Sequence, residues 1–180
     1  GQVLPQSTVY EASGFSAWGV SPDLRLKPEI AAPGGEVFSS IPDGAYEQSS
    51  GTSMATPQMA GVSTIVLQRV QSDPLFASMS ARQKADVVQN LIMGTARPLT
   101  DAAQTTGALY SPRKQGAGLV DALAATTSSV YPTVVGAPEQ SRPKADLGDG
   151  TKGWHFDVTL HNLSGVPATY ELSSQALSEI

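Results

Sequence analysis

The residues Gly51-Thr52-Ser53-Met54-Ala55-Thr56-Pro57 place a serine among small side chains, where a long apolar helix is expected to begin. A nucleophilic hydroxyl needs such a setting, because a substrate carbonyl must approach it and free backbone N–H groups must hold the resulting oxyanion. A helix N-terminus supplies unpaired donors and a partial positive charge. The stretch therefore predicts a nucleophile at Ser53. A helix cap built from small residues is the alternative interpretation.

The long helix is predicted to start close to Ser53. Apolar residues recur at steps of three and four from Met59 to Val70, and no charged residue lies between Ser53 and Arg69. This pattern predicts a helix that is buried on most sides. Pro57 is placed near the fourth or fifth helical position, where its ring is expected to press on a carbonyl near Ser53 and bend the helix.

Other local elements have weaker signals. A short strand is predicted from Val37 to Ile41, followed by a tight turn. Ser80 and Gln83 have capping-box spacing, which predicts the start of a second helix, and Gly94 is predicted to be its left-handed C-terminal cap. A third, short helix is expected from Leu119 to Ala125.

The last third of the chain has a different composition. Residues 126–150 are rich in Thr, Ser, Pro and Gly, which predicts a linker and loops. Residues 154–161 then alternate between apolar and polar, as do residues 166–172 after a turn, and this pattern predicts a β-hairpin. A lone hairpin is not stable. A β-domain is therefore expected to begin here.

Composition limits the class of protein. The 180 residues suit one domain or one and a fraction, and 40% hydrophobic residues suit a globular core. A net charge of −5 and a pI near 4.9 argue against nucleic acid or an anionic membrane as partner. The chain has no cysteine and no run of 18 apolar residues that could span a membrane. Its start is neither an initiator methionine nor a signal peptide, so an interior piece of a longer protein is expected.

Three blocks resemble one protein family. Gly51 to Gly61 resembles the active-serine signature of the subtilisin-like serine proteases, or subtilases. Phe15 to Gly19, with Lys27-Pro-Glu-Ile-Ala-Ala-Pro-Gly34, resembles the stretch that leads to that serine. Ser111 to Ala122 is similar to the segment that closes the catalytic domain in the large cell-envelope subtilases. These include the lactocepin-like proteinases and the complement-cleaving surface peptidases of Gram-positive bacteria.

The resemblance implies a role for each residue of the serine stretch. Ser53 would attack a peptide carbonyl to form an acyl-enzyme, which water hydrolyses. Its backbone N–H would be one oxyanion donor, with Thr52 assisting and Gly51 in the same oxyanion and substrate-binding region. The family order is Asp, His, Ser, so the acid, the base and the oxyanion Asn are expected before Gly1. Gln58 departs from the His that follows the proline in many subtilases, but that His is not the catalytic base.

The resemblance also implies an architecture and a setting. Residues 1–127 would be the C-terminal part of a three-layer α/β/α catalytic domain, and 128–180 a linker and the start of a fibronectin type III-like β-sandwich. The parent would be a secreted or cell-wall-attached endopeptidase acting on proteins or peptides. The upstream part of its catalytic domain would be the partner of this chain, which alone is expected to be inactive. No cofactor is implied, although structural calcium in the full-length protein is compatible with the family.

Two other functions fit part of the sequence. An α/β-hydrolase-type esterase would use Ser53, Asp101 or Asp121, and His155 in that order. Its nucleophile elbow needs a buried hydrophobic strand before the serine, whereas residues 45–50 are polar. A non-catalytic surface module, meaning a degenerate protease fragment with an adhesive or spacer β-domain, is the other alternative.

Several remaining motifs have simpler structural explanations. His155 and His161 are the only histidines, and both are interpreted as surface residues of the predicted strand. Ser111 to Lys114 has the spacing of a Ser-x-x-Lys motif and is interpreted as a chance match. Asn162 to Ser164 matches a glycosylation triplet, for which a hairpin turn is the simpler explanation. Asp23, Asp43 and Asp101 are loop carboxylates that could contribute to calcium binding but are expected to be solvated.

Overall fold

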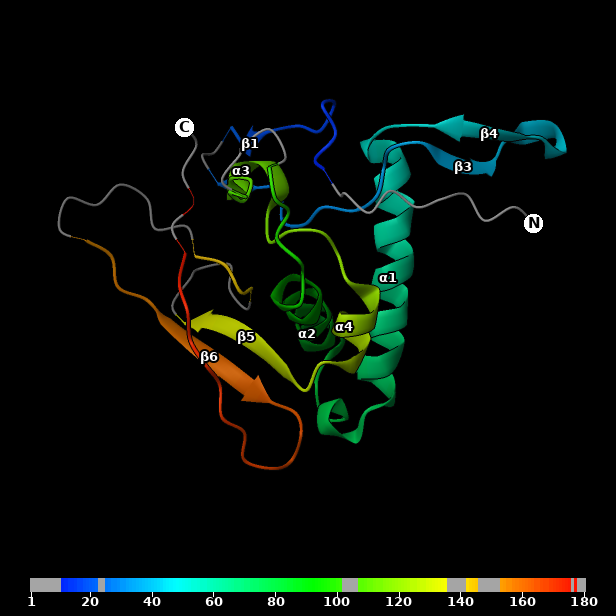
Figure 1. The fold of residues 1–180 in the computed structure, drawn as a ribbon. Helices are drawn as coiled ribbons and strands as arrows, with labels where there is room; N and C mark the ends of the chain where they lie inside the picture. Colours follow the sequence, from blue (N-terminus) through cyan, green and yellow to red (C-terminus); the bar gives the residue numbers. More distant parts are fainter. Residues whose placement is uncertain are drawn as a thin grey trace.

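The computed structural model describes residues 11–22, 25–101, 107–135, 142–145, 153–175 and 177. Two long helices organise the fold, α1 (Thr52–Ser72) and α2 (Ala81–Gly94), which pack against each other (Figure 1). A sheet of β5 (Val130–Val135) and β6 (Asp157–Asn162) packs on α2 through β5. The other elements are short: β1 (Gly19–Val20), β2 (Leu26–Lys27), β3 (Val37–Ser40), η1 (Pro42–Gly44), β4 (Tyr46–Ser49), η2 (Pro74–Phe76), α3 (Pro112–Gln115) and α4 (Ala122–Thr127).

Helix α1 confirms the predicted start to within one residue. It is less buried than its pattern predicts, because of its 21 residues Val66 and Val70 alone are buried. Pro57 is the sixth helical residue rather than the fourth or fifth, and the helix continues through it. Since proline has no N–H, the carbonyl of Ser53 receives no helical hydrogen bond from that position. The predicted bend stays a prediction.

Helix α2 begins as predicted and ends differently. The Ser80 hydroxyl accepts a hydrogen bond from the Gln83 N–H (3.3 Å), and the Gln83 side chain accepts one from the Ser80 N–H (2.9 Å). The capping box is therefore confirmed. Gly94 is not a left-handed cap but the last helical residue. A Cβ atom there would lie 2.6 Å from Cδ of Pro132, so this glycine lets β5 approach the helix.

Helix α4 corresponds to the short helix predicted from Leu119 to Ala125, and it starts three residues later than predicted. Its N-cap is Asp121, whose carboxylate accepts a hydrogen bond from the Ala124 N–H (2.9 Å). Leu119 lies outside the helix, where it forms a parallel bridge with Ala31 and an antiparallel bridge with Arg97. Leu119 was expected in the helix because an apolar side chain at this position fits the helical pattern as well as it fits an extended segment.

The β5–β6 sheet corrects the predicted hairpin. The two strands are antiparallel, with Tyr131 opposite His161 and Val134 opposite Val158. A strand is confirmed within 154–161, but residues 166–172 form no strand. The partner of β6 is β5 instead, which lies in the stretch predicted to be linker.

One core joins the helices to the sheet. Its buried members come from α1, η2, α2, α4 and β5: Val66, Val70, Phe76, Val87, Val88, Leu91, Ile92, Ala125 and Tyr131. By contrast, the apolar residues of the β6 region, Trp154, Phe156, Val158 and Leu160, are exposed. The described residues thus combine helices with two-stranded sheets, as expected of an α/β protein. Among the described helices, none has the length and apolar character to cross a bilayer.

Candidate active site

Ser53 is the second residue of α1, and its side chain is exposed. The first N–H groups of a helix have no intrahelical acceptor. Within the described part of the chain, the N–H groups of Thr52 and Ser53 have no hydrogen-bond acceptor, whereas those of Met54 and Ala55 both donate to the Gly51 carbonyl (3.0 and 3.4 Å). The serine hydroxyl is therefore accompanied by two free backbone donors.

Two glycines make this turn. Gly51 has φ 157° and ψ 164°, a conformation that essentially only glycine adopts without strain. Its N–H donates to the carbonyl of Gly34 (2.8 Å). A Cβ atom on Gly34 would lie 2.6 Å from the Gly51 carbonyl oxygen and 3.2 Å from Cβ of Ala55. The Ala32-Pro33-Gly34 segment thus lies in direct contact with the serine turn.

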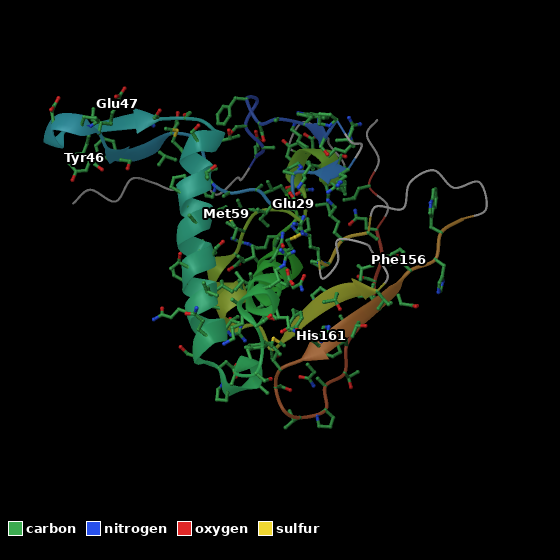
Figure 2. The ribbon with its side chains drawn as sticks, turned by 180° about the vertical axis from the view of Figure 1, so that it is seen from behind. Glu29, Tyr46, Glu47, Met59, Phe156 and His161 are labelled. Carbon is green, nitrogen blue, oxygen red and sulfur yellow. The ribbon has the colours of Figure 1, made fainter. Side chains whose placement is uncertain are left out.

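A hairpin of β3 and β4 leads into Gly51 (Figure 1). The predicted strand and the turn after it are confirmed, with Asp43 in the left-handed region (φ 65°). Phe38 and Tyr46 stack with ring centroids 5.7 Å apart, and Figure 2 shows Tyr46 and Glu47 on opposite faces of the hairpin. All four residues of β4 are exposed. The buried strand that a hydrolase elbow needs before its serine is therefore not found here.

A hollow of about 380 Å³ lies beside the serine turn. Most of its lining comes from residues 11–13, 15 and 16, residues 31–35, and Gly51, Thr52 and Ala55. Leu99, Lys114 and Leu119 complete the wall. The Lys114 ammonium lies 4.7 Å from the ring centroid of Trp18 and 4.3 Å from that of Tyr110. The contact with Trp18 holds the segment before β1 against α3, and the contact with Tyr110 is local to the chain that enters α3.

The phenol of Tyr110, whose ring lies against Lys114 behind the hollow's lining, stays neutral. Burial raises its pKa, and the negative charges of Asp101 and Glu11 raise it further, against a hydrogen bond with the backbone of Ala12. The contact between Lys114 and this ring is therefore a cation–π interaction rather than an ion pair.

Neither histidine is placed to serve Ser53. His161 stacks on Tyr131 with centroids 4.4 Å apart, and its Nε2 lies 2.9 Å from the Thr133 hydroxyl. Figure 2 shows His161 on β6, at the opposite end of the molecule from the hairpin that precedes Ser53. Burial lowers the pKa of His161, so its ring is neutral at pH 7. The interpretation of His161 as a plain surface residue is therefore wrong, because its ring is half-buried against Tyr131.

The side chains that the esterase alternative needs have structural partners. The His155 side chain is 89% exposed, with its Nε2 3.5 Å from the carboxylate of Asp157. Asp121 caps α4 and pairs with Arg97 (3.2 Å).

In the Ser-x-x-Lys match, Ser111 is the N-cap of α3, where its hydroxyl accepts a hydrogen bond from the Arg113 N–H. These arrangements favour structural roles for all of them.

A charge cluster centres on Glu29. Its carboxylate bonds to Lys27 and lies 3.0 Å from Arg142 and 3.7 Å from Lys144. Burial raises the pKa of Glu29, but the hydrogen bond from Lys27 and the three positive charges outweigh burial, so the pKa is lowered overall. The ionised carboxylate thus ties residues 142–145 to the segment that leads to Gly34.

No metal site is formed by the described residues, since they contain no group of three His, Asp or Glu side chains that could hold an ion. Of the three loop carboxylates, Asp43 is exposed at the tip of the β3–β4 hairpin and Asp101 contributes to the surroundings of Tyr110. Asp23 lies outside the described residues.

Residues 6–118 match the subtilase family. This chain belongs to the subtilase family. The resemblance of the three sequence blocks is therefore confirmed. A C5a peptidase of Streptococcus pyogenes is 33% identical over 166 residues, which are 92% of this chain and 14% of that protein. A PII-type proteinase of Lactococcus lactis subsp. cremoris is 34% identical over 169 residues, which are 90% of this chain and 9% of that protein.

This subtilase chain thus spans about a seventh of the first relative and less of the second. Among solved structures, the prenylagaramide maturation protease PagA is similar with a TM-score of 0.42 and 27% identity, over 61% of this chain and 34% of that one. At family level, the comparisons support a serine peptidase.

Sequence reasoning missed two contributors to the site. Gly34 was noted only as the end of the stretch that resembles the lead to the serine, and not as the residue whose missing side chain admits Gly51, because the contact joins residues 17 apart. Lys114 was seen only within a chance motif. Its cationic side chain and the aromatic residues Trp18 and Tyr110 were visible, but nothing in the sequence brought them together.

Proposed function

We propose that this chain carries the nucleophile, Ser53, of a subtilisin-like serine endopeptidase. The observation that supports this most strongly is the turn itself: an exposed hydroxyl beside the N–H groups of Thr52 and Ser53, which have no acceptor among the described residues. The positive end of α1 points at the same place. An attacked carbonyl oxygen would find both hydrogen bonds and favourable charge there.

The proposed reaction is acyl transfer to water. Ser53 Oγ attacks a peptide carbonyl, a proton acceptor takes the hydroxyl proton, and the amine leaves once it is protonated. The N–H of Ser53 donates to the oxyanion, with the Thr52 side chain and Gly51 lining the same place. His155 and His161 are far down the chain on the β6 side, so the acid, the base and the oxyanion Asn are assigned to the upstream part of the catalytic domain. The chain alone is then inactive.

The setting of the proposed enzyme follows the family. We assign residues 1–127 to the C-terminal part of a three-layer catalytic domain and 128–180 to a linker and the start of a fibronectin type III-like β-sandwich. The exposed apolar side chains of the β6 region are consistent with a sheet that another layer covers. The parent would be secreted or attached to the cell wall and would cleave proteins or peptides. No cofactor takes part in the reaction, and structural calcium would lie elsewhere in the full-length protein.

Fluorophosphonate labelling of the full-length protein, followed by peptide mapping, tests the assignment. We expect modification of Ser53, and we expect Ser53→Ala to abolish both labelling and proteolysis. Ser63→Ala, ten residues further along the same helix, is the matched control and should retain both. Labelling at another serine, or undiminished proteolysis by Ser53→Ala, would overturn the assignment. A full-length protein that is neither labelled nor proteolytic would favour the non-catalytic surface module.

A further inference from the structure

Residues 142–145 connect strand β5 to the carboxylate of Glu29. The Arg142 carbonyl accepts a hydrogen bond from the Val134 N–H of β5 (3.4 Å). The Arg142 guanidinium donates to Oε1 of Glu29 (3.0 Å), and the Lys144 ammonium lies 3.7 Å from the same oxygen. A short segment from the second half of the chain is therefore bonded to the sheet on one side and to Glu29 on the other.

The carboxylate of Glu29 is largely covered by its partners. Its side chain is 19% exposed and that of Lys144 is 12% exposed, and the Lys144 ammonium also donates to the Leu26 carbonyl in β2. An ion pair between exposed side chains contributes little, whereas removal of one partner from a covered pair leaves a charge without compensation. The attachment of residues 142–145 to Glu29 is therefore expected to resist displacement.

The backbone of residues 29–34 links this attachment to the serine turn. At one end the Glu29 carbonyl accepts a hydrogen bond from the Ala117 N–H (2.9 Å). At the other end the Gly34 carbonyl accepts one from the Gly51 N–H (2.8 Å), and a Cβ atom on Gly34 would lie 2.6 Å from the Gly51 carbonyl oxygen. Because the two glycines are in contact, a displacement of residues 29–34 also displaces the turn.

This route is separate from the β3–β4 hairpin, which is the segment that enters Gly51 along the chain. Figure 2 shows Glu29 well away from Tyr46 and Glu47 on that hairpin. All four residues of β4 are exposed. The hairpin therefore offers the turn less support than the covered cluster around Glu29.

We propose that Glu29 is a positioning residue for Ser53, and that residues 142–145 hold the serine turn in place through it. This inference rests on the proposed function, in which Ser53 is the nucleophile. Small displacements of a nucleophile slow its reaction strongly, because the reacting atoms must be aligned. A segment that follows the proposed catalytic domain thus contributes to the reactivity of the serine without touching it.

Variants of the full-length protein test the coupling with two readouts. Fluorophosphonate labelling gives the rate at which Ser53 reacts. Hydrogen exchange followed by mass spectrometry gives the protection of the peptide that contains the Gly51 N–H. Glu29→Gln and Arg142→Gln should each slow labelling by about three- to tenfold and speed the exchange of that peptide by a similar factor.

Three comparisons separate positioning from a general loss of stability. Arg142→Lys keeps a cation near Glu29 and should recover most of the labelling rate. The double variant Glu29→Gln/Arg142→Gln should lose no more than Glu29→Gln alone, because both changes remove the same contact. Arg82→Gln breaks an ion pair with Asp86 on α2 and is the matched control, which should change neither readout. Thermal unfolding shows that each variant is folded at the assay temperature.

The outcomes separate this proposal from the proposed function. Slower labelling and faster exchange in both variants, with recovery in Arg142→Lys, support both. The same exchange pattern in a protein that is never labelled supports the coupling and contradicts the protease assignment. Unchanged labelling in folded variants, or an equal loss in Arg82→Gln, overturns the role of Glu29, whereas labelled Ser53 in the unmodified protein still supports the protease. If Glu29→Gln does not fold, Arg142→Gln and Arg142→Lys decide the same question.

Discussion

The two halves of helix α1 differ in what surrounds them. The second half carries Val66 and Val70, both fully buried in the main core. In the first half, from Thr52 to Ala60, no residue is buried and a proline interrupts the hydrogen-bond ladder. The first two N–H groups there have no acceptor in the part of the chain that the structure describes. The helix is thus anchored at one end and open at the other, which is where chemistry is proposed.

This difference teaches that stability and reactivity are placed in separate parts of one element. Core packing around Val66 and Val70 fixes the position of the helix. The first turn is therefore held in place although its own side chains are not buried. Substitutions in the two halves should therefore affect different measurements.

The largest expected effect is in the anchored region. Leu91→Ala removes a fully buried side chain from the main core and should lower the free energy of unfolding by about 2–5 kcal/mol. Urea denaturation of the 180-residue chain measures it. Leu123→Ala, at a 72% exposed leucine, is the control and should change stability by less than about 0.5 kcal/mol. Equal losses from the two variants would contradict the assigned core.

Gly34→Ala should act on the open end instead. The new Cβ atom would meet the Gly51 carbonyl oxygen and displace the serine turn, so labelling of Ser53 in the full-length protein should slow about 100-fold. Gly61→Ala is the matched control, because nothing lies within 4 Å of its Cβ position. It should instead stabilise the helix by about 0.5–1 kcal/mol and leave labelling unchanged. An undisturbed labelling rate in Gly34→Ala would break the distinction between the two halves.

A smaller effect is expected at the cap of α4, which packs beside α1. Asp121→Ala removes both the helix cap and the pair with Arg97, and should lower the free energy of unfolding by about 1 kcal/mol. Asp86→Ala, which removes an i,i+4 pair with Arg82 on α2, should cost only about 0.3–0.5 kcal/mol. Thermal unfolding of both variants gives the ranking, and the reverse order would show that the cap contributes little.

The smallest effect is pH-dependent and lies on the β5–β6 side of the core. Because burial lowers the pKa of His161, the folded state binds a proton less readily than the unfolded state. Stability is therefore complete above the unfolded pKa near 6.5 and decreases as the pH falls through the folded pKa. His161→Gln should show a smaller loss between pH 7 and pH 5, whereas His155→Gln, at an exposed position, should follow the unmodified chain. Identical pH profiles of His161→Gln and the unmodified chain would exclude His161 as the cause.

Local signals in the sequence predicted local structure well. The pairing of Ser80 with Gln83 and the start of α1 depend on residues within one helical turn, so both could be identified from spacing. The serine stretch likewise has its glycine, its serine and its proline within seven residues. The candidate nucleophile was therefore predictable without coordinates.

The errors involve residues far apart in the chain. Gly94 looks like a helix cap until Pro132 is seen to pack on it, and the alternation of residues 166–172 is the same whether or not a strand partner exists. Strand β5 was not predicted, because Pro132 and the polar residues around it are typical of a loop. Asp121 could have been identified as an N-cap, since it directly precedes the short helix.

The two tryptophans, each 55% exposed, sit in different settings. Trp18 lies under the ammonium of Lys114, a residue that lines the hollow beside the serine turn, whereas Trp154 precedes β6 among the exposed apolar residues. Their emission can consequently be assigned by replacing one indole at a time. The chain carries intrinsic fluorescent reporters, one for events around the hollow and one for burial of the outer sheet, and no dye need be attached.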